Sequence, residues 1–125
     1  MRTAITRSSL LLLLWLTCFT TACAQVDYYA NKAKDYMREA DYYTQKAQDY
    51  ERDANYYNNQ AQNYLREADY YSRHNNTDKA RTYMRWAQEA TDKARLRNGW
   101  ASDAREKARL RLRWAKEALD KAKTK

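Results

Sequence analysis

The sequence of 125 residues has no proline, one glycine (Gly99), one histidine (His74) and two cysteines. Without proline and glycine, the chain lacks the residues that usually mark turns and interrupt strands. Cys18 and Cys23 both lie near the start of the chain, so the remainder has no cysteine pair for a disulfide or for a cysteine-based metal site. The sequence therefore predicts a helical protein with no metal and no cofactor.

A thick apolar core is also missing. Mean hydropathy is −1.12, and charged residues make up 32% of the chain. Alanine, lysine, arginine, glutamate, aspartate and glutamine fill most positions outside the aromatic residues, and these residues favour long helices. The length allows one domain. Neither a nucleophile–base pair nor a phosphate-binding glycine loop occurs, so we do not expect an enzyme.

What the chain does contain is a regular series of alanines at intervals of seven residues. Such spacing is typical of heptads that place small residues along one side of a helix. We assign these alanines, together with Val26, to heptad position a. The series runs through Ala33, Ala40, Ala47, Ala54, Ala61 and Ala68, and after one irregular gap through Ala80, Ala87, Ala94, Ala101, Ala108, Ala115 and Ala122.

Tyrosines follow the alanines of the first half by three residues, at heptad position d. These seam tyrosines are Tyr29, Tyr36, Tyr43, Tyr50, Tyr57, Tyr64 and Tyr71. A second set, the outer tyrosines, recurs every fourteen residues at position c, just beyond the seam: Tyr28, Tyr42, Tyr56 and Tyr70. The pattern predicts one helix over residues 26–74 with alanine at a and tyrosine at d.

The heptad phase breaks only at residues 74–79. Asparagine tolerates left-handed backbone conformations and threonine caps helix N-termini. We therefore predict a turn at 75–77, with Thr77 as N-cap, and a second helix over 78–123. One continuous helix is the alternative architecture.

An antiparallel pairing of the two halves matches each seam tyrosine with an alanine. Tyr71 then faces Ala80 at one end and Tyr29 faces Ala122 at the other, with the fold point between the two asparagines of the gap. Because large side chains meet small ones, this pairing packs more evenly than a parallel dimer of identical chains. The predicted fold class is all-α, a long antiparallel two-helix coiled-coil hairpin that follows a cleaved signal peptide.

Trp86, Trp100 and Trp114 recur every fourteen residues at position g of the second half. On a folded hairpin they lie on the same side as the outer tyrosines. With Arg97 and Arg111 they form a candidate binding face for another hairpin, a membrane surface or a ligand.

Charge is distributed unequally between the two halves. Residues 26–75 hold seven Lys and Arg against nine Asp and Glu, whereas residues 76–125 hold fifteen against seven. Opposite net charge favours pairing of the two halves. The basic half is also suited to anionic lipid or to an acidic cell-wall polymer. We do not expect nucleic acid as a partner, because the first 24 residues, described next, predict export.

The first 24 residues are typical of a signal peptide. Arg2 and Arg7 precede an apolar run over residues 10–16, and small residues follow. Two cleavage positions are compatible with the sequence. In one, residues 19–23 form a lipobox and Cys23 becomes the lipid-bearing first residue. In the other, Ala22-Cys23-Ala24 is an A-x-A site and the mature chain begins at Gln25.

The Thr20–Cys23 segment, the alanine heptads and the terminal lysine together resemble the small alanine-zipper lipoproteins of the bacterial outer membrane, the murein-lipoprotein type. The resemblance implies lipidation of Cys23 and attachment of Lys125 to peptidoglycan, although the chain lacks the aromatic–Arg–Lys ending of that family. Residues 76–80 also look like the turn of periplasmic helical-hairpin lipoproteins.

Taken together, these patterns predict an exported, lipid-anchored structural coiled coil of the cell envelope, in the periplasm or at the outer membrane, that forms homo-oligomers. The alternative is a binding module whose Trp, Tyr and Arg side chains contact anionic lipid, peptidoglycan or another cell-wall polymer.

Overall fold

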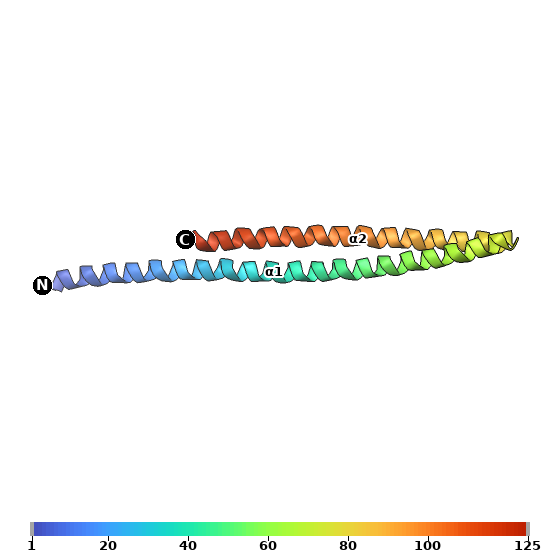
Figure 1. The fold of residues 1–125 in the computed structure, drawn as a ribbon. Coiled ribbons are helices and arrows are strands. Elements are labelled where there is room, and N and C mark those ends of the chain that lie inside the picture. Colours follow the sequence, from blue (N-terminus) through green and yellow to red (C-terminus); the bar gives the residue numbers. More distant parts are fainter. Residues whose placement is uncertain (1, 125) are drawn as a thin grey trace. The chain divides into compact units, whose positions relative to one another are not determined.

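The chain forms two helices that pack against each other as a hairpin, so the all-α prediction is confirmed. Our computed structural model describes the backbone of residues 2–124 and the side chains of residues 23–124. Helix α1 spans Arg2–Arg73 and helix α2 spans Thr77–Lys123 (Figure 1). The side chains of residues 1–22, where most of the expected signal peptide falls, and all of Lys125 lie outside the described residues. Within the described residues, neither helix has an apolar stretch long enough to span a membrane.

A left-handed asparagine ends α1. Asn75 has a φ of 59°, a conformation that asparagine accepts more readily than other non-glycine residues. The Asn76 N–H donates to the Tyr71 carbonyl at 2.9 Å, and the Asn75 N–H donates to the Ser72 carbonyl at 3.3 Å. This pair of hydrogen bonds is the Schellman arrangement, which satisfies carbonyl groups at the end of a helix.

The same turn begins α2. The carboxamide oxygen of Asn76 accepts a hydrogen bond from the Lys79 N–H at 3.3 Å, and its carbonyl accepts one from the Ala80 N–H at 3.1 Å. Asn76 is therefore the N-cap, and the expectation of Thr77 in that role was wrong. Asparagine precedes threonine in N-cap preference. Helix α2 therefore begins one residue before its predicted start, and α1 also ends one residue before its predicted end.

Contacts divide the chain into two compact units. One is Asp41–Arg109, which includes the turn, and the other combines Met1–Ala40 with Leu110–Lys125. In both units the buried apolar residues of the described chain are all alanines. They are Ala33, Ala40, Ala47, Ala54, Ala61 and Ala68 in α1, and Ala87, Ala90, Ala94, Ala101, Ala104, Ala108, Ala115 and Ala118 in α2. The predicted position-a alanines from 33 to 68 are all among them.

Helix α2 continues through Asn98-Gly99, which is a common turn dipeptide. Gly99 is exposed, and a Cβ placed on it meets no atom within 4 Å. The unbroken alanine spacing across this dipeptide thus predicts the local structure better than the dipeptide does.

Candidate functional site

Each of the three tryptophans of α2 packs edge-to-face against a seam tyrosine of α1. The ring centroids are 5.5 Å apart for Tyr36 and Trp114, 5.5 Å for Tyr50 and Trp100, and 5.7 Å for Tyr64 and Trp86. Aromatic rings prefer this geometry because the positive edge of one ring meets the negative face of the other. The tryptophans therefore lie beside the seam, and Trp86 and Trp100 remain 39% and 38% exposed.

Lysines alternate with the tryptophans along position g of α2, and they cover the seam tyrosines that have no tryptophan. The ammonium nitrogen of Lys107 lies 5.6 Å from the ring centre of Tyr43, and that of Lys93 lies 5.6 Å from Tyr57. The same contact recurs between Lys79 and Tyr71 and between Lys121 and Tyr29. Each lysine is thus placed for a cation–π interaction.

Between these contacts, small residues at position d of α2 leave space beside the tyrosines. Where this position holds Ala90, Ala104 or Ala118, an open pocket occurs next to a tryptophan; where it holds Arg97 or Arg111, a guanidinium covers the surface instead. We call the three hollows the aromatic pockets and name each by its tryptophan. They repeat because both helices repeat at fourteen residues.

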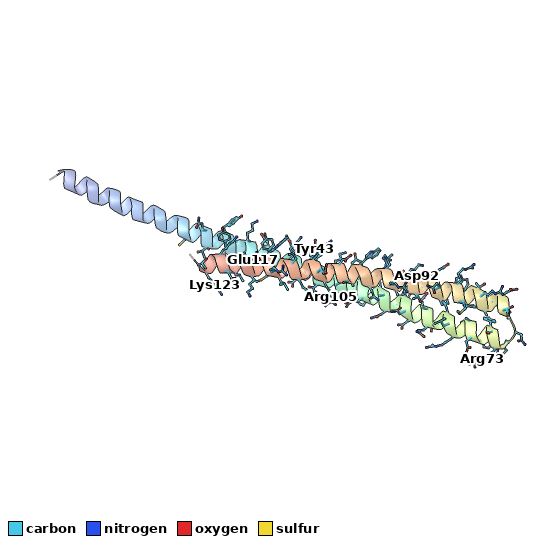
Figure 2. The ribbon with its side chains drawn as sticks, turned by 90° about the horizontal axis from the view of Figure 1, so that it is seen from above. Tyr43, Arg73, Asp92, Arg105, Glu117 and Lys123 are labelled. Carbon is cyan, nitrogen blue, oxygen red and sulfur yellow. The ribbon has the colours of Figure 1, made fainter. Side chains whose placement is uncertain are left out.

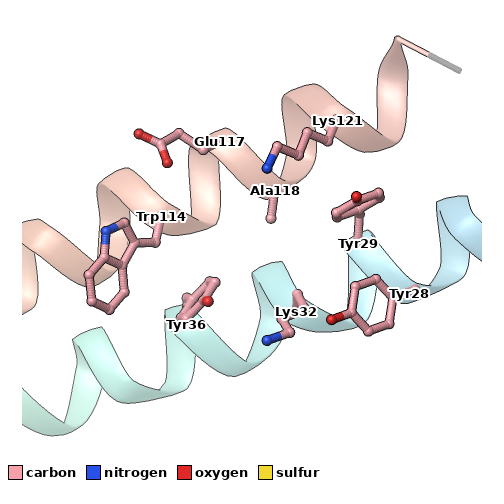
Figure 3. A pocket seen from close by; sticks show the side chains of 8 residues that line it. All are labelled: Tyr28, Tyr29, Lys32, Tyr36, Trp114, Glu117, Ala118 and Lys121. Atoms are coloured by element: carbon pink, nitrogen blue, oxygen red, sulfur yellow. The ribbon is translucent and has the colours of Figure 1, made fainter.

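The Trp114 pocket lies in the unit that combines the two chain ends and has a volume of about 340 Å³. Figure 3 shows Tyr36 and Trp114 at one side and Tyr28 and Tyr29 at the other, with Ala118 between them. Lys32 from α1 and Lys121 and Glu117 from α2 complete its lining. The pocket combines aromatic walls with two ammonium groups and one carboxylate.

The other two pockets lie in the unit Asp41–Arg109. The Trp100 pocket, of about 380 Å³, has the residue types of the Trp114 pocket at each corresponding position, with Asp for Glu. Its polar side chains are Lys46, Lys107 and Asp103. In the Trp86 pocket, of about 290 Å³, Gln60 replaces the lysine of α1, donates a hydrogen bond to the Tyr56 hydroxyl and accepts one from the Tyr64 hydroxyl. This third pocket is therefore less cationic.

Arg97 and Arg111 lie against the tryptophans but already have protein partners. Their guanidinium carbons are 4.3 Å from the ring centre of Trp100 and 4.5 Å from that of Trp114. The Arg111 Nε donates to the carboxylate of Glu39 at 2.5 Å. The Arg97 Nε lies 3.9 Å from a carboxylate oxygen of Asp53, close enough for an ion pair but too far for a hydrogen bond. Both arginines consequently join the two helices, each within its own unit.

A further cross-helix pair, between Arg105 and Glu51, lies in the unit Asp41–Arg109 with an N–O distance of 2.6 Å. Figure 2 labels Arg105 on α2. By contrast, four arginines of α2 make no ion pair within the described chain. They are Arg81, Arg85, Arg109 and Arg113.

The remaining candidate residues lie apart from the aromatic pockets. Cys23 is exposed and unpaired in α1, and the proposed attachment residue Lys125 is outside the described residues. Over the side chains that the structure places, no three His, Cys, Asp or Glu residues gather as a metal-binding group would require.

Three features of this site were not inferred from the sequence: the pockets, the lysines over the tyrosines and the pairing of Glu39 and Asp53 with arginines. The sequence of α2 contains a pattern that could have predicted all three, because residue types alternate at two heptad positions with a period of fourteen residues. Tryptophan alternates with lysine at position g, and alanine alternates with arginine or tyrosine at position d.

The fold thus defines a class, the helical hairpin with an alanine seam and a repeated aromatic surface. Comparison of the chain with protein-family models, with curated proteins and with solved structures finds no match. The resemblance to alanine-zipper lipoproteins stays an expectation.

Proposed function

We propose that this protein is a non-catalytic structural component of the cell envelope: an exported helical hairpin that is anchored by a lipid on Cys23 and associates with copies of itself. The observation that carries the proposal is the distribution of side chains. Only alanines are buried between the described helices, whereas eleven large apolar side chains are exposed. A surface of this kind serves contacts with other molecules, because exposed apolar clusters mark interaction sites.

The position of Cys23 supports the anchor. Its side chain is exposed and unpaired, so no structural role in the hairpin competes with acylation. It also follows an apolar leader and three small residues, Thr20, Thr21 and Ala22. A single acyl chain binds membranes only weakly, so stable anchoring needs the further acyl chains that bacterial lipoproteins receive or a second contact.

Metabolic labelling with a fatty acid in bacterial cells tests the anchor. The unaltered chain should take up label and sediment with membranes, and the Cys23→Ser variant should lose both properties while remaining helical. Ala24→Ser is the matched control, since it alters the neighbouring small residue and keeps the thiol. An unlabelled chain with Gln25 at its N-terminus contradicts the proposal.

A second candidate function, binding of anionic lipid or a cell-wall polymer such as peptidoglycan, is favoured by the four arginines of α2 that have no ion-pair partner in the described chain. Such binding weakens as salt rises, because ions screen exposed charges. Sedimentation with peptidoglycan and with vesicles containing phosphatidylglycerol, at low and high salt, measures it. Binding that survives high salt, or that is unchanged in Arg109→Gln with Arg113→Gln, contradicts this second function.

A further inference from the structure

The outer tyrosines have no cross-helix partner to cover them. In the unit Asp41–Arg109, Tyr42, Tyr56 and Tyr70 are 56%, 58% and 53% exposed. Each meets the neighbouring seam tyrosine edge-to-face, with centroids 5.2–5.4 Å apart, which fixes the ring but leaves its outer part exposed. These side chains form a row of regularly spaced phenol rings that project from α1.

The aromatic pockets are lined by the same groups, a tryptophan ring and a lysine ammonium group, that contact the seam tyrosines within this chain. Tyr50 meets Trp100 edge-to-face, and Tyr43 lies under the ammonium group of Lys107. Both tyrosines, the tryptophan and the lysine line the Trp100 pocket. A further phenol ring entering it meets aromatic rings and two ammonium groups, and Asp103 is available to accept a hydrogen bond from the hydroxyl.

The spacing of the rings equals the spacing of the pockets. The Trp100 and Trp86 pockets are separated by fourteen residues in both helices, and so are Tyr42 and Tyr56. By helical rise this interval is about 21 Å. A second copy of the chain can therefore place two rings in two pockets at once, which strengthens binding beyond that of one contact.

Charge favours the same occupant. Asp41 precedes Tyr42, which places a carboxylate beside this outer tyrosine, whereas Asp69, which precedes Tyr70, already pairs with Arg73 at 3.1 Å. The Trp100 pocket has two ammonium groups against one carboxylate. An acidic segment with a tyrosine is thus complementary to a pocket with excess positive charge.

We propose that the aromatic pockets receive the outer tyrosines of a second copy of this chain, in a pair with two-fold symmetry. Each copy contributes rings and pockets, as a self-complementary interface requires. The inference deepens the proposed function and rests on its self-association, for which it names the surface. A saccharide that stacks on the same rings is the rival occupant.

Photocross-linking in cells that produce the full chain tests the contact directly. Benzoylphenylalanine at Tyr56 should give an adduct of twice the monomer mass, with the cross-link in a residue that lines the Trp100 or Trp86 pocket. The control position is Leu112, which is also exposed but lines none of the three pockets; it should give little adduct. An adduct with polysaccharide or lipid in place of a second copy overturns the inference.

Co-purification of two differently tagged copies separates this inference from the proposed function. Ala90→Leu with Ala104→Leu fills two pockets, and Gln88→Leu with Ser102→Leu adds the same side chains at exposed positions. The first pair should lower co-purification roughly tenfold or more, as loss of an interface hot spot does, and the second should not. Tyr56→Ser with Tyr70→Ser removes two rings that line none of the three pockets, without touching buried residues, and should match the first pair.

The outcomes are distinct. If the unaltered copies do not co-purify, self-association and this inference both fail. If the copies co-purify and neither the filled pockets nor the absent rings reduce the yield, the copies associate through another surface and only the inference fails. Circular dichroism of each variant shows whether the helices are intact, and the two serine substitutions keep the test valid where leucine disturbs folding.

Discussion

Single alanines set how closely the two helices approach. Ala47 and Ala54 have no exposed surface, and no larger apolar residue of the described chain is buried between the helices. A methyl group fills little volume, so the helix backbones and the flanking tyrosines supply most of the contact. Any larger side chain at these positions has to separate the helices or leave its preferred rotamer.

We therefore expect Ala47→Leu to destabilise the hairpin by about 1–3 kcal/mol, the usual cost of overpacking. Gln48→Leu introduces the same side chain one residue further along, where the surface is exposed, and should change stability by less than about 0.5 kcal/mol. Urea unfolding followed by circular dichroism measures both. Equal stability of the two variants contradicts an alanine seam at this position.

Gly99 is the opposite case, a residue whose replacement should help. It lies in the interior of α2, and an added Cβ meets no atom within 4 Å. Gly99→Ala should raise the free energy of unfolding by about 1 kcal/mol, because alanine loses less conformational freedom in a helix. Ser102→Ala, also exposed, should have a smaller effect. A lower unfolding midpoint for Gly99→Ala contradicts an exposed helical position with free space for a Cβ.

For single residues, the sequence predicts which positions are buried better than it predicts which charged side chains form ion pairs. The alanine spacing placed Ala33 to Ala68 in the seam, and they are buried. It did not predict that Glu39 and Asp53 pair with Arg111 and Arg97, because position d was assigned to seam contacts. Arginine has a long side chain whose charged end can leave the seam while its stem remains there. The heptad position of a residue does not specify the direction that such a side chain takes.

At the scale of the elements, a short turn determines where α1 ends and where α2 begins. The backbone N–H groups of Asn75 and Asn76 donate to the last carbonyls of α1, and the side chain and carbonyl of Asn76 accept from the first N–H groups of α2. Asn75 adopts the left-handed conformation and Asn76 caps α2. The heptad break predicted the place of this turn. The assignment of its N-cap failed because Asn76 and Thr77 are both good caps, and only the geometry decides between them.

Two substitutions at Asn75 should therefore act in opposite directions. Asn75→Gly should stabilise the hairpin by up to about 1 kcal/mol, since glycine adopts positive φ without steric cost. Asn75→Ala should destabilise it by about 1–2 kcal/mol, the cost of a left-handed conformation for a residue with a Cβ. Thermal unfolding of both variants beside the unaltered chain measures the difference. A stabilising alanine shows that Asn75 does not hold φ near 59° in solution.

At the scale of the whole molecule, the cross-helix contacts of the described residues join segments of α1 and α2 within the same unit. Tyr36 with Trp114 and Glu39 with Arg111 belong to the unit of the chain ends. Tyr50 with Trp100 and Glu51 with Arg105 belong to the unit Asp41–Arg109. In a protein built from such repeats, stability is close to a sum of neighbouring contributions, so one end can unfold without the other.

This organisation predicts the result of ending the chain at Arg109. The unit Asp41–Arg109 keeps its turn and its cross-helix contacts, whereas residues 26–40 lose the segment of α2 that packs on them. An unpartnered helical segment of this length is marginal in water. Amide hydrogen exchange should therefore stay slow within 41–109 and become fast within 26–40. A chain ending at Lys123 is the control and should keep slow exchange in both. Fast exchange throughout the shortened chain contradicts this prediction. It shows that the hairpin folds only as a whole and that the aromatic pockets of Asp41–Arg109 need the chain ends in order to form.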